Sequence, residues 1–174
     1  MGRIYATAAV LGLLASAAWA APQDVKLPEN WRETFVKYWE GDRAPPNDTQ
    51  TGVAWANRVA LESAKGGGPL AYGSMIVFEV YKAKLDAEGK PVLDEQGRRI
   101  PDTLALVAVM EKREGAGAAW PEEIRNGDWE MAAFTPQGTF IERDYAPCLE
   151  CHKPLEDQDY IFTRSFLDEA ASGR

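Results

Sequence analysis

The sequence predicts a single α+β domain with antiparallel strands at its centre and helices flanking them, rather than a four-helix bundle. The clearest strand covers residues 75–84, where side chains alternate between two faces with the period of a β-strand. Residues 103–112 form a second, largely apolar stretch, and the charged segment 86–101 between them contains glycine and proline. Two strands joined in this way are expected to pair antiparallel. Strands separated by segments with glycine and proline leave no room for the four long amphipathic helices of a bundle.

Residues 1–20 have the composition of a secretory signal peptide. Arg3 supplies the positive charge, residues 6–18 are apolar and dominated by alanine and leucine, and Ala18 and Ala20 are the small residues that a signal peptidase reads. The apolar run is too short to span a bilayer. We therefore expect cleavage after Ala20 and export to the periplasm. The alternative is that the segment remains as an uncleaved anchor.

The expected mature chain, residues 21–174, is a single domain: removing 20 of the 174 residues leaves 154. Loss of Arg3 leaves 18 basic against 27 acidic residues, so the net charge changes from −8 to −9. A chain this acidic is not expected to bind nucleic acid or an anionic membrane surface. Its hydrophobic content of 45% is sufficient for one core.

The mature domain is predicted to open with a helix over residues 31–40. Asn30 is a candidate N-cap, and Glu33 holds the reciprocal position of a capping box. Residues 41–50 include two prolines, an asparagine and an aspartate, and are predicted to form a loop. Four aromatic residues of the helix fall at helical spacing and are expected to pack into the core: Trp31, Phe35, Tyr38 and Trp39.

The other elements are predicted from local periodicity and from the turn residues that separate them. Three glycines and a proline end one helix, and the sequence Thr-Pro-Gln-Gly is typical of a hairpin turn. The expected elements are a strand at 52–55, a helix at 57–65, two strands at 128–134 and 139–142 joined by that turn, and a final helix within 159–171.

Near the C-terminus, Cys148-Leu149-Glu150-Cys151-His152 has the form C-x-x-C-H, the attachment signature of a c-type haem. Each thiol adds to one vinyl group of the porphyrin, and the histidine binds the iron. A zinc site is disfavoured because zinc needs four ligands, and the chain has only these two cysteines and one histidine. A thioredoxin-like pair would follow an early strand of a βαβ unit, which the sequence lacks. A structural disulfide in an exported protein is the remaining alternative.

The axial coordination of the iron can be predicted from the histidine and methionine residues of the chain. His152 is the only histidine, so two histidines cannot bind the iron. A small electron-transfer cytochrome carries a methionine ligand after its motif, whereas Met75, Met110 and Met131 all precede it. We therefore expect one covalently attached haem c with a five-coordinate iron, bound by His152 and open to a small ligand on its other side.

Short stretches along nearly the whole mature chain match one family pattern. The most specific match pairs C-x-x-C-H-K with D-Y-I-F-T-R. The stretches are Leu27-Pro28 with Asn30-Trp31-Arg32, Trp55-Ala56-Asn57, residues 73–77, residues 148–153 and residues 159–164. In these stretches the chain resembles the cytochrome P-460 and cytochrome c′-beta family of periplasmic mono-haem proteins. The resemblance implies an antiparallel β-sheet with flanking helices, a homodimer, and a haem held against the sheet.

The two branches of that family differ on the distal side of the haem. In the P-460 branch, which oxidises hydroxylamine, a lysine is tied covalently to the porphyrin and a carboxylate lies on the following strand. An ungapped match from Gly73 places Phe78 at the lysine position and Val107 at the carboxylate position. In the c′-beta branch a phenylalanine caps the distal pocket, and the protein binds nitric oxide and carbon monoxide. The resemblance therefore favours c′-beta, with Phe78 and Val107 in the distal pocket.

Two alternatives for this region remain open. The first is that Phe78 serves only core packing, as apolar strand residues usually do. A shifted register could bring Lys82 to the porphyrin edge, although a four-residue step along a strand covers about 13 Å.

A pocket lined by these apolar residues is expected to admit neutral gases and to exclude water and anions, which lose hydration on entry. We therefore favour a non-enzymatic protein that binds nitric oxide or carbon monoxide. The second hypothesis is a hydroxylamine-oxidising enzyme, which needs the lysine cross-link and a proton acceptor. The third is an electron carrier with a periplasmic redox partner, which needs a stable sixth ligand or an exposed haem edge.

Overall fold

The computed structural model describes residues 24–173. The predicted signal peptide, residues 1–20, lies outside the described residues. Within the described range, no helix is long and apolar enough to cross a membrane.

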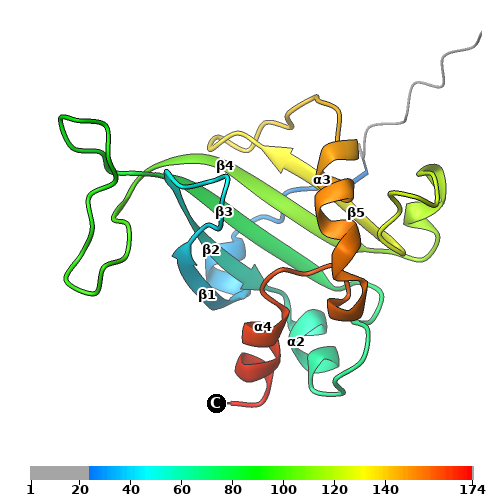
Figure 1. Ribbon diagram of the computed structural model, residues 1–174. Helices are drawn as coiled ribbons and strands as arrows, with labels where there is room; N and C mark the ends of the chain where they lie inside the picture. Colours follow the sequence, from blue (N-terminus) through cyan, green and yellow to red (C-terminus); the bar gives the residue numbers. More distant parts are fainter. Residues whose placement is uncertain (1–23, 174) are drawn as a thin grey trace, which may run out of the picture.

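A five-stranded sheet forms the centre of the fold, and its strands lie in the order of the chain (Figure 1). All neighbouring strands pair antiparallel. The prediction of an α+β fold that is not a helical bundle is therefore confirmed. The strands are β1 (Val36–Asp42), β2 (Gln50–Ala56), β3 (Met75–Ala83), β4 (Pro101–Lys112) and β5 (Trp129–Phe134).

Between β3 and β4 the chain leaves the sheet as a protruding arm, residues 84–100 (Figure 1). Two isolated bridges shape the arm, one between Leu85 and Pro91 and the other between Leu93 and Arg99. The predicted excursion between two antiparallel strands is confirmed.

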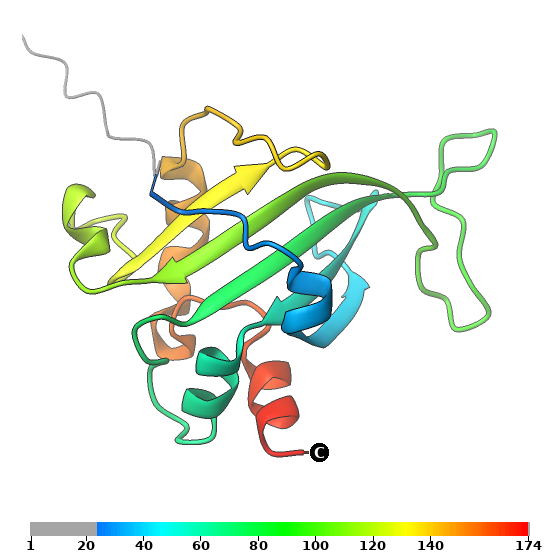
Figure 2. The same cartoon turned by 180° about the vertical axis from the view of Figure 1, so that it is seen from behind.

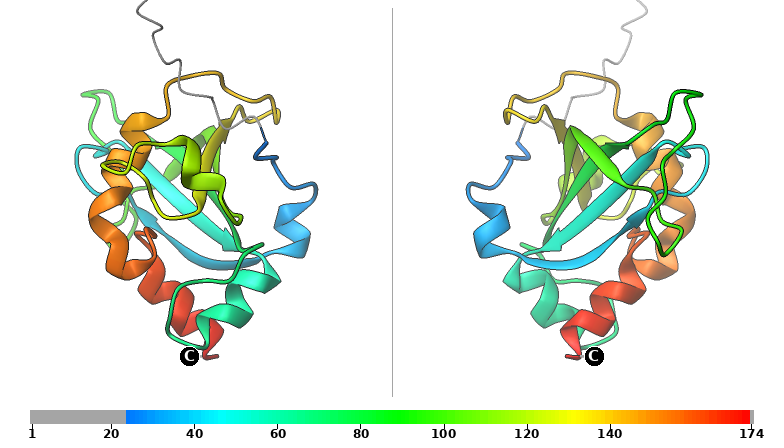
Figure 3. Two further views of the ribbon diagram at one scale, coloured as in Figure 1. Left: turned by 90° about the vertical axis from the view of Figure 1, so that its right-hand side faces the viewer. Right: turned by 90° about the vertical axis from the view of Figure 1, so that its left-hand side faces the viewer.

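The helices divide between the two faces of the sheet. We call one side the helix-covered face, because α2 (Arg58–Ala64), α3 (Ala146–His152) and α4 (Arg164–Ala171) lie on it (Figure 1). The other side, the N-terminal face, is crossed by residues 24–30 and by α1 (Trp31–Thr34) (Figure 2). Seen edge-on, the sheet lies between these two coverings (Figure 3). Two short 3₁₀ helices, η1 (Ala116–Ala119) and η2 (Lys153–Gln158), complete the elements.

Each face of the sheet has its own core, because successive residues of a strand point to opposite sides. Ile76 of β3 belongs to the core between the sheet and the helices, together with Leu149 of α3. The next residue, Val77, belongs to the core of the N-terminal face, together with Phe134 of β5. Burial of one such side chain contributes about 1.5–3 kcal/mol. The alternation seen in the sequence of β3 therefore stabilises both layers.

The predicted helix over residues 31–40 is wrong beyond Thr34. Phe35 is extended and the chain then enters β1, which is rich in the aromatic and β-branched residues that favour strands. A bulge at Tyr38 adds one residue to this strand, so the consecutive residues Tyr38 and Trp39 both pack on the helix-covered face, as neighbours on a helix can. Asn30 has a φ of 51° and makes no side-chain cap, so the expected capping box does not form.

Most of the other predicted elements are confirmed with shifted ends. Asn57 caps α2, where its side chain accepts a hydrogen bond of 2.9 Å from the Ala60 amide. The strand predicted at 139–142 is reduced to one bridge between Phe134 and Phe140. The sheet therefore ends at β5.

Candidate haem-binding site

The C-x-x-C-H motif forms α3, which lies against the helix-covered face. Cys148, Cys151 and His152 are three and four residues apart, so they share one side of this helix. Leu149 turns into the core and is 1% exposed, which anchors the helix. Both cysteines are free thiols, Cys148 half-buried and Cys151 exposed. The two sulfurs and the imidazole are therefore available on one side of a fixed helix.

His152 is oriented by the backbone that follows it. Its Nδ1 lies 2.7 Å from the carbonyl oxygen of Tyr160. A carbonyl only accepts, so Nδ1 donates, and the lone pair of Nε2 is left for a metal. The ring of Phe162 meets the imidazole edge-on, with 4.8 Å between centroids. Burial lowers the pKa of His152, opposed in part by the Tyr160 carbonyl, and this lowering favours the neutral imidazole that binds iron.

A buried ion pair holds the Tyr160 carbonyl in place. Asp159 and Tyr160 both have positive φ, 52° and 63°, so the helix predicted within 159–171 begins only at α4. The Asp159 carboxylate binds Lys112 Nζ of β4 at 2.7 and 3.0 Å and accepts a bond of 2.8 Å from the Leu70 amide. Asp159 is 7% exposed and Lys112 8%. These contacts secure an otherwise strained turn beneath the imidazole.

Phe78 lies on the helix-covered face, where it pairs with Ala54 of β2 and Ala108 of β4. Its ring lies across Gly52: a Cβ added to that glycine would come within 2.3 Å of Phe78 Cζ. Trp39 of β1 stacks against the ring, with 5.8 Å between centroids and 19° between planes. The small neighbours and the stacked tryptophan together fix the position of the ring.

Val107 lies on the opposite side of the sheet, which corrects the prediction that it shares a pocket with Phe78. It pairs with Glu79 rather than with Phe78 and is fully buried in the core of the N-terminal face. A shift of one residue along a strand exchanges its two faces, so an ungapped match cannot fix the face on which Val107 lies. Ala108, which pairs with Phe78, is the residue of β4 that shares the helix-covered face with it.

Arg43, which the sequence analysis did not single out, also belongs to this site. Its Cζ lies 5.8 Å from the centroid of the Phe78 ring, and its Nη1 donates to Gln50 Oε1. Its positive charge contributes to lowering the pKa of His152. No local signal marks this residue, because only the pairing of β1 with β2 and β3 brings it to the haem motif.

The model of the family described as Cytochrome P460 matches residues 28–163. The chain belongs to the cytochrome P460 family. The match includes the whole sheet, the C-x-x-C-H helix and the turn that positions His152. Among curated proteins, no sequence matches the chain. Membership implies that this is a c-type haem protein.

The residues around His152 fit such a haem. Phe162 is 56% exposed and Phe166 44%, although both are large apolar side chains. Phe166 packs beside Trp39, with 6.3 Å between centroids, and this extends the aromatic surface from β1 to α4. Apolar side chains that remain open beside a neutral histidine match the flat apolar surface of a porphyrin.

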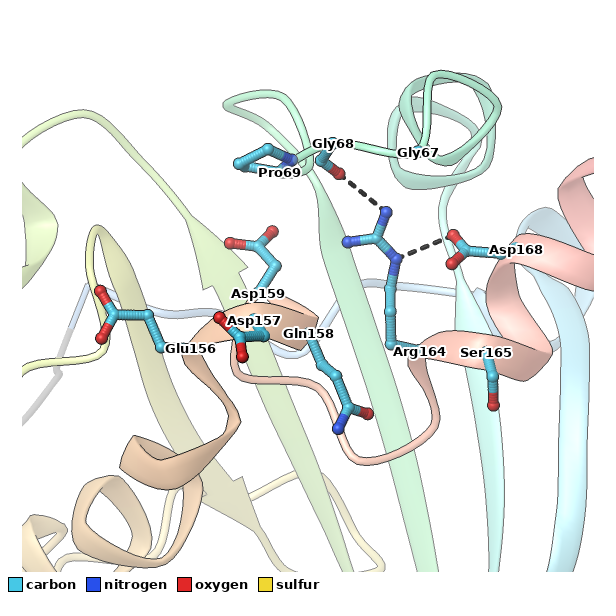
Figure 4. A pocket seen from close by; sticks show the side chains of 10 residues that line it. All are labelled: Gly67, Gly68, Pro69, Glu156, Asp157, Gln158, Asp159, Arg164, Ser165 and Asp168. Carbon is cyan, nitrogen blue, oxygen red and sulfur yellow. Dashed lines mark hydrogen bonds and ion pairs between the residues drawn. The ribbon is translucent and has the colours of Figure 1, made fainter.

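A separate cavity of about 320 Å³ lies between the glycine turn after α2 and the start of α4 (Figure 4). Arg164 crosses it and binds the Gly68 carbonyl at 2.7 Å and the Asp168 carboxylate at 2.8 Å. None of the motif residues lines this cavity. Arg164 therefore acts as a brace that holds α4, and with it Phe166, beside the sheet.

Proposed function

We propose that this member of the cytochrome P460 family is an exported mono-haem protein that binds nitric oxide and carbon monoxide. The observation that carries the proposal is the Phe78 ring, held over Gly52 and stacked on Trp39 on the face of the sheet toward His152. The haem iron would supply one open coordination position. The aromatic side chains would limit that position to small ligands.

The proposed five-coordinate iron rests on the lack of a second histidine or methionine ligand among residues 24–173. His152 is the only histidine of the chain. Met110 and Met131 are buried in the core beneath the helices, and Met75 packs against the core of the N-terminal face. None of the three is a free side chain beside the Phe78 ring.

Hydroxylamine oxidation is the less favoured function. Phe78 has no amine with which to form a bond to the porphyrin, and Ala108, its neighbour on β4, has no proton-accepting group. The nearest strand carboxylate in sequence, Glu79, is directed to the N-terminal face, where Trp55 Nε1 donates to it at 2.9 Å. Lys82 is exposed at the end of β3.

Electron transfer is a second candidate, favoured by one observation. Cys151 and Phe162 are both exposed, so one edge of a haem attached here would lie near solvent. An exposed edge permits electron exchange with a periplasmic redox partner. A fast electron self-exchange rate of the purified protein would support this role beside gas binding.

The experiment is a titration of the haem-loaded protein with carbon monoxide and nitric oxide, together with a hydroxylamine oxidation assay on the same preparation. Saturable binding of both gases without hydroxylamine turnover supports the proposal. Turnover of hydroxylamine with an electron acceptor would contradict it. The intact mass and sedimentation of protein from the periplasmic fraction would test removal of residues 1–20, covalent attachment of one haem, and the proposed homodimer.

A further inference from the structure

We propose that Arg43 makes the Phe78 side of this site a receptor for small monoanions, such as azide or nitrite, bound at the haem iron. The inference rests on the proposed function, because it requires a five-coordinate iron facing Phe78. It also revises the expectation of a wholly apolar pocket that excludes anions.

The position of Arg43 is fixed by its surroundings. The residue directly follows β1, and its guanidinium lies over the ring of Phe78 at 5.8 Å. Gln50, the first residue of β2, takes a hydrogen bond from its Nη1. Arg99 of the arm donates to the Arg43 carbonyl at 2.9 Å and to the Gln50 carbonyl at 3.1 Å, so the loop between β1 and β2 is held at both ends.

The charge of Arg43 has no protein counter-ion in the described part of the chain. No carboxylate of residues 24–173 lies within ion-pair distance of it, although the side chain is half-buried. Burial lowers the pKa of Arg43, because the charged guanidinium is partly desolvated. A half-buried cation without a counter-ion favours an anion beside it.

The guanidinium also retains the donors that an anion needs. An arginine has five N–H groups in a planar fork. Gln50 takes one of those of Arg43, and the others have no hydrogen-bond partner among the described residues. They remain available next to the ring that faces the iron position.

A haem propionate is the other anion that an arginine could bind, and the chemistry of the porphyrin argues against it here. The vinyl groups that react with the two cysteines occupy the edge of the porphyrin opposite the propionates. A propionate would therefore lie at the edge away from the thioether bonds, whereas Arg43 lies over the ring of Phe78, the proposed cap of the iron. We therefore assign its guanidinium to the ligand position.

The test is an azide titration of the ferric, haem-loaded protein at fixed ionic strength. Arg43→Gln removes the charge but keeps a polar side chain, and it should weaken azide binding about 10- to 100-fold. Arg43→Lys keeps the charge but loses the planar set of N–H donors. Its azide affinity should lie between those of the wild type and Arg43→Gln. Arg58→Gln is the matched control, because Arg58 is exposed on α2 and its charge acts on Glu62. It should leave azide affinity unchanged.

A second readout separates this role from propionate binding. A positive donor beside bound carbon monoxide lowers its C–O stretching frequency, so Arg43→Gln should raise that frequency in the ferrous complex. Unchanged azide affinity and an unchanged C–O stretch in Arg43→Gln would overturn the inference while gas binding stands. If wild-type protein binds neither carbon monoxide nor azide, the proposed function fails instead.

Discussion

The ring of Phe78 occupies the space that a side chain at Gly52 would need. A Cβ on Gly52 would lie 2.3 Å from Phe78 Cζ and 2.7 Å from Cε1, both at the free end of the phenylalanine. The β2 glycine is therefore a positioning residue for the ring on β3. The stacked Trp39 holds the ring from the other side.

Gly52→Ala should displace the Phe78 ring without preventing folding. We expect a stability loss of about 1–3 kcal/mol, typical of an overpacked site. We also expect an altered carbon monoxide association rate and C–O stretch, measured by flash photolysis and infrared spectroscopy. Gly68→Ala is the control, because a Cβ there meets nothing within 4 Å. Identical ligand kinetics in Gly52→Ala and wild type would show that the ring position does not govern access.

Phe78→Ala should open the distal side to water. The side chain packs against Trp39 and Arg43, so its removal leaves a space that a polar donor borders. We expect the ferric haem to change from five-coordinate to six-coordinate, which electron paramagnetic resonance and optical spectra detect. Phe166→Ala also removes an aromatic residue beside Trp39 and should change the coordination less. A five-coordinate Phe78→Ala variant would argue against the proposed cap.

Asp159→Asn should be severely destabilising. It leaves the buried ammonium of Lys112 without its counter-charge, and removing one partner of a buried pair costs about 3–5 kcal/mol. Chemical denaturation of the haem-loaded protein measures this loss. Adding Lys112→Met to Asp159→Asn should restore part of the stability. Asp94→Asn, which breaks the solvent-screened pair with Arg98, is the control and should change stability little.

Tyr38 should contribute to the alkaline instability of the protein. Burial raises the pKa of this phenol far above its usual value, although the hydrogen bond to Thr163 opposes the shift. The unfolded chain then loses this proton near pH 10 while the folded chain keeps it, so stability falls as the pH rises above 10. Urea denaturation at pH 8 and pH 11 should show a smaller loss in Tyr38→Phe than in wild type. An equal loss of stability in the two proteins would show that ionisation of Tyr38 does not cause the alkaline instability.

The central strands of the sheet were predictable from the sequence because their side chains alternate clearly between two faces. The alternation of residues 75–84 survives in β3, where Ile76 and Val77 enter different cores. The first strand does not show the alternation of a β-strand because the bulge at Tyr38 puts Tyr38 and Trp39 on the same face. Local periodicity cannot show a bulge, since the extra residue is defined only by the partner strand.

The proximal half of the site was more predictable than the distal half. His152 and the two cysteines belong to one local motif, whereas the acceptor for His152 Nδ1 is a backbone carbonyl that has no sequence signature. Val107 was misplaced because one residue of register decides the face of a strand. Arg43 reaches the site only through the pairing of three strands.

The most direct test of the account is the optical spectrum of the purified ferrous protein before and after addition of nitric oxide. The account predicts a five-coordinate high-spin haem with ordinary c-type absorption, which shifts when nitric oxide binds. A strongly red-shifted Soret band without added ligand would mean a modified porphyrin. That result would contradict the role assigned to Phe78 and would favour the hydroxylamine-oxidising function.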